Sequence, residues 1–92
     1  MKKYIVVAYD ITSDKRRDKI CDLLSTYGKR VNYSVFECFL RERDIRALKD
    51  EMEKHLNKRE DTVLFYYLCR DCVGKIERVG KFCDERRVVK VI

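Results

Sequence analysis

The feature that most constrains the fold of this chain is an apolar run that ends on a carboxylate, YIVVAYD at residues 4–10. A near-continuous apolar run is typical of a strand that is buried on both faces, so a central strand is predicted over residues 3–9. Asp10 would then stand on rigid backbone at the end of the strand, aimed at the surface. It suits a divalent cation held against a phosphodiester, and it equally suits the cap of a turn or helix.

The segment behind this strand predicts a helix followed by two short strands. Ser13 is a good N-cap, apolar residues then recur at helical spacing, and Gly28 would stop the helix. The apolar alternation of residues 31–40 changes parity midway, which indicates a bulge or tight turn near residues 32–34. A second helix is predicted over residues 44–57.

The second half of the chain predicts further strands. Residues 62–69 form another wholly apolar run, expected beside the first strand at the sheet centre, with Tyr66 or Tyr67 in the core. A short strand is predicted over residues 76–79, and an apolar strand over residues 87–92 that could add to another subunit. The element order is that of an α+β, ferredoxin-like split βαβ sandwich (βαββαβ), formed as a single domain by residues 1–92.

The charge of the chain favours a polyanionic partner. The 22 basic and 16 acidic residues give a formal net charge of +6, and four basic residues cluster at the first predicted helix: Lys15, Arg16, Arg17 and Lys19. Arginine suits phosphate because its planar fork bonds bidentately. No stretch has transmembrane length and the first residues do not resemble a signal peptide, which predicts a cytoplasmic protein with no membrane partner.

The five cysteines include one C-x-x-C motif, Cys69 to Cys72. The motif could be half of a zinc site, but four-ligand sites usually need a second pair. Only Cys83 and the distant His55 remain to supply it. We therefore favour structural or incidental thiols over a metal or redox site, and the role of Cys69 and Cys72 stays open.

Several motifs carry a family resemblance: YIVVAYDIT at residues 4–12 with two arginines behind it, GKRVNYSVFE at 28–37, LCRDC at 68–72 with Gly80, and a terminal VVKVI. Together they resemble the small CRISPR-associated endonuclease of spacer acquisition, the non-integrase subunit of the adaptation complex. The similarity extends over nearly the whole chain.

The resemblance implies a homodimer in which the last strand crosses to the partner's sheet. It implies that Asp10 is the catalytic residue and binds Mg²⁺ (or Mn²⁺) across the dimer axis from its symmetry mate. It also implies a nucleic-acid substrate and a CRISPR integrase subunit as partner. The remaining positions expected to line the cleft, contact nucleic acid or support activity are Tyr9, Arg16, Arg17, Lys19, Arg30, Ser34 and Phe36.

Two functions follow from these expectations. The first is a metal-dependent endonuclease that cleaves phosphodiester bonds of RNA, DNA or both. One Asp10 per chain is too few for such a site, but a symmetric dimer supplies two, and water fills the remaining positions around Mg²⁺. The alternative is a non-catalytic scaffold that binds double-stranded DNA and bridges integrase subunits. A ribonuclease toxin of similar fold is a weaker option, and the charge argues against a small-molecule regulator.

Overall fold

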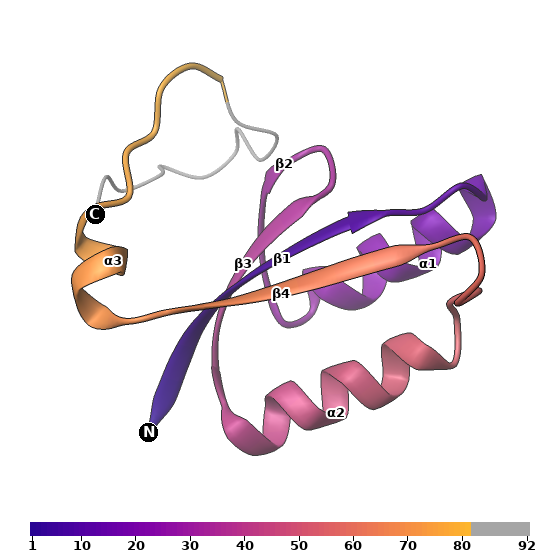
Figure 1. Cartoon of the computed structure of the whole chain (residues 1–92), viewed down its shortest axis with the longest axis horizontal. Coiled ribbons are helices and arrows are strands. Elements are labelled where there is room, and N and C mark those ends of the chain that lie inside the picture. Colours follow the sequence, from indigo (N-terminus) through magenta and orange to yellow (C-terminus); the bar gives the residue numbers. More distant parts are fainter. Residues whose placement is uncertain (82–92) are drawn as a thin grey trace.

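The computed structural model describes residues 1–81, which form a four-stranded antiparallel sheet and three helices (Figure 1). The elements are, in chain order, β1 (Lys2–Asp10), α1 (Asp14–Ser25), β2 (Gly28–Asn32), β3 (Val35–Arg41), α2 (Glu42–Glu53), β4 (Thr62–Leu68) and α3 (Arg70–Gly74). The sheet order is β2-β3-β1-β4. This confirms the predicted α+β fold of ferredoxin-like order. The predicted strand over residues 87–92 lies outside the described residues.

Helix α1 begins as predicted but ends earlier than Gly28. The Arg16 backbone N–H donates to Ser13 Oγ at 3.2 Å, so Ser13 is the N-cap. The helix ends at Ser25, and Gly28 is instead the first residue of β2. A Cβ atom at Gly28 would collide with the carbonyl oxygen of Glu37 and the sulfur of Cys38. Glycine is therefore needed here for close strand approach and not for the helix stop.

The predicted break in residues 31–40 is confirmed as a hairpin. Strands β2 and β3 pair around a turn at Tyr33 and Ser34, and their register shifts between Arg30 and Asn32. Helix α2 starts two residues before the predicted position, because extended Arg41 serves as its N-cap. It ends before residue 57, where the Asn57 backbone N–H donates to the Asp61 carboxylate at 3.0 Å.

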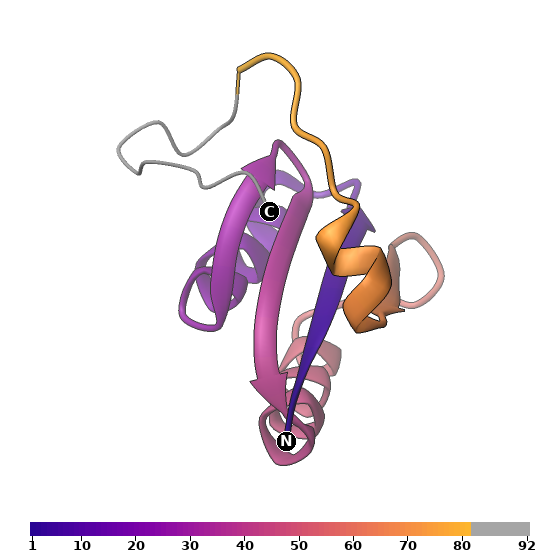
Figure 2. The same ribbon diagram turned by 90° about the vertical axis from the view of Figure 1, so that its left-hand side faces the viewer.

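The two faces of the sheet differ in what covers them. Helices α1 and α2 lie on one side, as Figures 1 and 2 show, and we call this the covered face. Alternate strand residues pack there against helix residues, and the buried cluster comprises Ile5, Val7, Tyr9, Ile11, Ile20, Leu24, Phe36, Cys38, Ile45, Leu48 and Met52. The opposite side, the open face, presents Tyr4, Val6, Ala8, Asp10, Val35, Glu37, Phe39, Leu64, Tyr66 and Leu68.

The prediction that β4 lies at the sheet centre is wrong. Strand β1 is central, between β3 and β4, whereas β4 is at an edge of the sheet formed by residues 1–81. Tyr66 and Tyr67 are 51% and 47% exposed, so the expectation that one of them is a core residue is also wrong. Tyr66 is on the open face, and Tyr67 lies at the rim of α2, where Lys49 Nζ donates to its hydroxyl at 2.9 Å. An apolar run does not reveal whether both of its faces will be covered.

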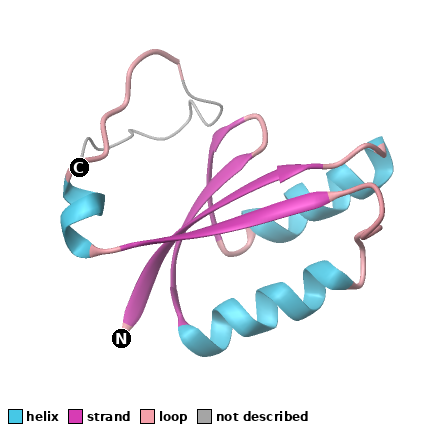
Figure 3. Ribbon diagram, in the orientation of Figure 1, coloured by secondary structure: helices cyan, strands magenta, loops and turns pink. Residues whose placement is uncertain are grey.

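The predicted strand over residues 76–79 is also wrong. Residues 70–74 form α3, and the chain then continues as a loop (Figure 3). This loop is held by an ion pair in place of ladder hydrogen bonds: Arg78 Nη1 donates to Glu37 Oε2 at 3.0 Å, on the open face. The two side chains are only 7% and 13% exposed. None of the helices formed by residues 1–81 is long and apolar enough to cross a membrane.

Candidate functional site

Asp10 is the exposed end of β1. It pairs with Thr62 of β4 in the ladder, and strand alternation puts its side chain on the open face with Ala8. No hydrogen bond or ion pair within residues 1–81 engages its carboxylate. Because Ser13 caps α1, Asp10 does not serve as the helix cap. Its carboxylate therefore remains available for a ligand.

Arg17 fixes the turn that follows Asp10. Its Nε and Nη2 donate to the Ile11 carbonyl oxygen at 3.3 and 3.0 Å, and Nη1 donates to Asp14 Oδ1 at 2.6 Å. The hydrogen bond to Asp14 is the main cause of a raised Arg17 pKa. Ile11 itself is buried. Arg17 thus holds the connector next to the candidate carboxylate.

The Arg16 guanidinium donates to two carboxylates of the loop before β4, those of Asp61 and Glu60. Its Nε donates to Asp61 Oδ2 at 2.8 Å, and Nη2 donates to Asp61 Oδ1 and Glu60 Oε1, both at 3.1 Å. The Asp61 carboxylate also accepts from the backbone of Thr12 and Asn57. The Arg16 hydrogen bond lowers the pKa of Asp61 to about 2. Arg16 thus joins the loop before β4 to the start of α1, and its predicted contact with nucleic acid stays a prediction.

Sequence patterns alone missed the role of Asp61. Its one local signal is the Asn57–Asp61 spacing, in which a carboxylate accepts from the backbone four residues earlier. Its partner Arg16 lies 45 residues away in sequence. No periodicity connects such positions, so the Arg16–Asp61 pair becomes visible only in the folded chain.

Tyr9 and Phe36 lie beneath the site and not in it. Tyr9 alternates with Asp10 and therefore points to the covered face, where it is 5% exposed and stacks on Phe36, with ring centroids 6.3 Å apart. Phe36 is fully buried. Of the roles expected for these two rings, burial leaves support of the site from beneath and not direct contact with nucleic acid. Burial raises the pKa of Tyr9 to about 12.

The β2–β3 turn lies beside the end of β1. The Tyr9 backbone N–H donates to the Ser34 carbonyl oxygen at 3.1 Å, which brings Ser34 close to the end of β1 that carries Asp10. Arg30 Nη2 donates to the Tyr33 carbonyl oxygen at 2.8 Å, and its guanidinium stacks over the Tyr33 ring. Arg30 and Ser34 therefore shape the turn at this end of the sheet.

Lys19 is exposed on α1, on the covered side of the sheet, so the structure does not bring it to the face that carries Asp10. Lys15 is likewise exposed on α1. Of the four basic residues predicted to form one patch, the two lysines face solvent while the two arginines are engaged with Asp61, Ile11 and Asp14.

The donor set for a metal is small. No group of three or more His, Cys, Asp or Glu side chains in the described part of the chain is arranged to hold a metal ion. Asp10 offers one hard carboxylate, which suits Mg²⁺ or Mn²⁺, and such ions keep several waters when bound to few protein ligands. The residues present therefore fit a Mg²⁺ site only as half of a symmetric pair.

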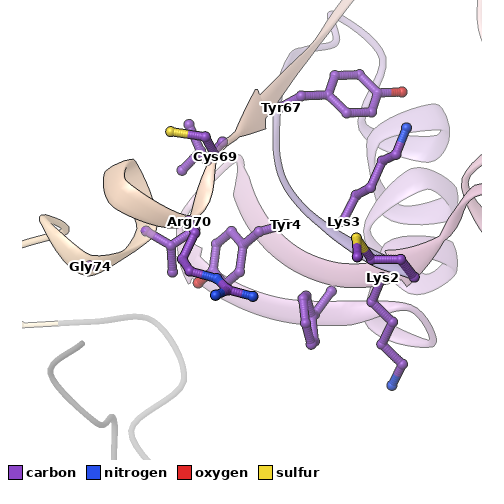
Figure 4. Close-up of a pocket in the computed structure, with 11 residues that line it drawn as sticks. Lys2, Lys3, Tyr4, Tyr67, Cys69, Arg70 and Gly74 are labelled. Carbon is purple, nitrogen blue, oxygen red and sulfur yellow. The ribbon is translucent and has the colours of Figure 1, made fainter.

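A groove lies at the other end of the sheet (Figure 4). It is an open hollow with a volume of about 1070 Å³ between the start of β1 and the β4–α3 junction. Its lining comprises Met1, Lys2, Lys3, Tyr4, Phe39, Tyr67, Leu68, Cys69, Arg70, Val73 and Gly74. Tyr4 and Asp10 are separated by roughly 20 Å at the rise of an extended strand. The groove and the Asp10 end are therefore separate sites.

Comparison with known proteins points to one family. The sequence model of the family described as CRISPR associated protein Cas2 matches residues 1–76. A curated relative from Thermus thermophilus, named CRISPR-associated endoribonuclease Cas2, is 40% identical over 77 residues, which cover 84% of this chain and 82% of the relative.

Two solved structures extend the comparison. A hypothetical protein from Thermus thermophilus aligns with a TM-score of 0.81 and 38% identity, covering 89% of this chain and 95% of its own. A chain of a partial Cas6-RT-Cas1–Cas2 complex aligns with a TM-score of 0.73 and 27% identity, covering 98% of this chain and 99% of its own.

Proposed function

The chain belongs to the CRISPR-associated Cas2 family, and from this premise we propose that it is a metal-dependent endonuclease acting on phosphodiester bonds of RNA, DNA or both. Its curated relative carries the name endoribonuclease. The observation that carries the proposal is the exposed Asp10 carboxylate, which ends the central strand without a hydrogen-bond or ion-pair partner in residues 1–81.

The proposed active unit is a homodimer packed open face to open face. Leu64, Tyr66 and Phe39 are 53%, 51% and 56% exposed in one chain, and burial of such side chains would favour association. Asp10 is on the same face, so a two-fold axis through this face would bring a second Asp10 towards the first. The predicted transfer of residues 87–92 to the partner's sheet is part of this proposal.

In the proposed site each Asp10 contributes a carboxylate to a shared Mg²⁺ or Mn²⁺. A bound ion would supply an activated water and neutralise charge on the phosphate. Arg17 keeps the Asp10 turn in place through the Ile11 carbonyl, and Tyr9 packed on Phe36 supports the strand end from beneath. Arg30 and Ser34 shape the neighbouring turn against which a nucleic-acid backbone would lie.

The nuclease proposal is tested by comparing Asp10→Asn with Asp50→Asn, a charge-matched control at an exposed position of α2. Cleavage of single-stranded RNA and double-stranded DNA is measured with Mg²⁺, with Mn²⁺ and with EDTA. We expect Asp10→Asn to lose more than about 100-fold, because changing even outer-shell metal partners costs roughly 10–100-fold. Cleavage by Asp10→Asn at the wild-type rate would reject the assignment.

The dimer is tested separately, by light scattering across a concentration series. Tyr66→Ser alters the open face, and Tyr67→Ser alters the matched tyrosine at the rim of α2. We expect Tyr66→Ser to shift the chain towards the monomer while Tyr67→Ser leaves the mass unchanged. Equal behaviour of the two variants would argue against open-face association.

The second candidate function is a scaffold that binds double-stranded DNA and bridges Cas1 integrase subunits. It is favoured by the likeness to a Cas2 chain whose complex contains Cas1, and by the net charge of +6. In this case neither the wild type nor Asp10→Asn would cleave at a significant rate, and Asp10→Asn would retain DNA and Cas1 binding. Backbone binding should weaken steeply as salt rises, because counterions are released; a flat salt response would count against this function.

A further inference from the structure

The function proposed above leaves one reactive pair of side chains unused. Cys69 ends the β4–α3 junction as the N-cap of α3, and Cys72 lies inside that helix. Both are exposed free thiols. Cys38 is the contrasting case, because burial raises its pKa to about 11 and keeps it from solvent.

The spacing of the two thiols suits a bond between them. Residues three apart on a helix have Cβ atoms roughly 5–6 Å apart, and a disulfide needs about 3.5–4.5 Å. Cys69 has an extended backbone, with φ −74° and ψ 169°, and so is not yet part of the helix. A small rotation at this residue would close the remaining gap.

The two thiols differ in pKa: that of Cys69 is lowered and that of Cys72 is raised. The Cys72 backbone N–H, followed by its thiol, donates to the Cys69 sulfur and lowers the pKa of Cys69. The same thiol contact raises the pKa of Cys72. A thiolate is the attacking species in thiol–disulfide exchange. Cys69 is therefore the better nucleophile, and Cys72 is suited to the second step.

Cys69 also lines the groove at the start of β1, whereas Cys72 does not. Lys2 and Arg70 contribute positive charge to the same groove, whereas the Lys3 ammonium is paired with Glu42 at 2.8 Å (Figure 4). Its volume of about 1070 Å³ admits a molecule of peptide size. The surroundings of Cys69 thus favour a small disulfide that carries carboxylates.

We propose that Cys69 and Cys72 form a reversible redox pair that exchanges with small anionic disulfides such as glutathione disulfide. The Cys69 thiolate attacks one sulfur of glutathione disulfide, whose S–S bond breaks and releases one glutathione thiolate. Cys72 then attacks the Cys69 sulfur, closing the Cys69–Cys72 bond and releasing the second glutathione. Two protein thiols lose two electrons, one disulfide gains them, and the two thiol protons end on the two glutathiones.

Closing this bond would act on the loop that covers part of the open face. Arg78, which pairs with Glu37, lies only six residues after Cys72. A tightened first turn of α3 would change the path of the intervening residues. We therefore expect oxidation to change amide hydrogen exchange across residues 73–81, while the distant α1 amides stay unchanged.

The test uses the full chain in a Cys83→Ser background, because Cys83 lies outside the described residues. Glutathione disulfide is added and intact masses are recorded under denaturing acid. We expect the parent to lose two hydrogens and retain no glutathione. Cys72→Ser should trap one glutathione on Cys69, and Cys69→Ser should react more slowly. Cys21→Ser, a control away from α3, should behave as the parent.

Two results would overturn the proposal. One is a Cys69–Cys72 pair that stays reduced in every glutathione buffer in which the chain remains folded. The other is a disulfide that peptide mapping assigns to Cys21 or Cys38. The charge preference has its own test, in which cationic cystamine should react more slowly than glutathione disulfide at low salt. Arg70→Ala should narrow this difference, and an unchanged ratio would remove the groove from the proposal.

Discussion

The two faces of the sheet are built from the same strands and both contain large apolar residues, yet these residues have different environments. On β3, Phe36 faces the helices and is fully buried, whereas Phe39 faces the open side and is 56% exposed. On β1, Ile5 and Val7 are fully buried, while the intervening Val6 is only partly buried. An apolar strand therefore predicts burial of both of its faces, but within residues 1–81 helices α1 and α2 pack against only one of them.

The open face carries its own polar system in place of helices. Glu37 accepts from the Tyr4 hydroxyl at 2.6 Å and pairs with Arg78 of the loop after α3. Burial alone would raise the pKa of Glu37, but the bonds from Arg78 and Tyr4 outweigh it and the pKa is lowered. Burial, together with the bond to Glu37, raises the pKa of Tyr4 to about 12. Hydrogen bonds and an ion pair at Glu37 therefore fix side chains on the open face, whereas apolar packing fixes those on the covered face.

The largest expected contrast is between Phe36→Ala and Phe39→Ala. Removing a fully buried phenylalanine leaves a cavity and should lower the free energy of unfolding by about 3–5 kcal/mol. Phe39→Ala in the monomer should cost less than about 1 kcal/mol. Denaturant unfolding at low protein concentration measures both. Similar losses would mean that the open face is already covered in solution, which would break the comparison.

The next contrast concerns two glycines. Gly28→Ala should lower the free energy of unfolding by about 1–3 kcal/mol, because its Cβ would press on the Glu37 carbonyl and the Cys38 sulfur. Gly74→Ala is the matched control, because a Cβ atom added at Gly74 would meet no other atom within 4 Å and the residue lies in α3. Thermal unfolding of the two variants gives the comparison. A tolerated Gly28→Ala would show that β2 and β3 can separate without cost.

The Arg16–Asp61 and Arg78–Glu37 ion pairs should respond differently to acid. The pKa of Asp61 falls from 3.8 to about 2, so its contribution is present above about pH 4 and is lost as the pH falls through 2. The shift corresponds to at most about 2–3 kcal/mol, reduced by screening at the partly exposed Arg16.

Unfolding free energies of the wild type, Asp61→Asn and Glu37→Gln between pH 2 and pH 5 would measure this effect. Asp61→Asn should remove most of the pH dependence, and Glu37→Gln should remove less. If Glu37→Gln flattened the profile more than Asp61→Asn, the open-face pair would be the stronger anchor.

The smallest expected effect is at Tyr9. Its hydroxyl is buried, and no group within residues 1–81 meets hydrogen-bond geometry with it. Tyr9→Phe keeps the ring on Phe36 and removes the unsatisfied polar atom, so stability should stay equal or rise by up to about 1 kcal/mol. Tyr4→Phe is the control on the open face and should destabilise, because it removes the bond to Glu37. A loss of stability in Tyr9→Phe would show that the hydroxyl is engaged, for which the neighbouring Cys21 thiol is the first candidate.

Local signals predicted the parts of the fold that local physics controls. Ser13 was identified as the cap because its side chain bonds within the first helical turn. The break near residues 32–34 followed from a change of strand parity. Asp10 was identified because a carboxylate ends an apolar strand. The same reasoning failed for residues 76–79, whose path depends on the distant Glu37.

The sequence by itself determined the strand and helix periods, the order of elements as far as β4 and the position of Asp10, because each depends on residues within a few positions of one another. Tertiary structure decided which face is covered, that Tyr9 and Phe36 point into the core, and that Arg16 pairs with Asp61 across 45 residues. These outcomes depend on long-range contacts, whose partners no local pattern specifies. The carboxylate of Asp10 can therefore be recognised in the sequence, but its surroundings exist only after folding.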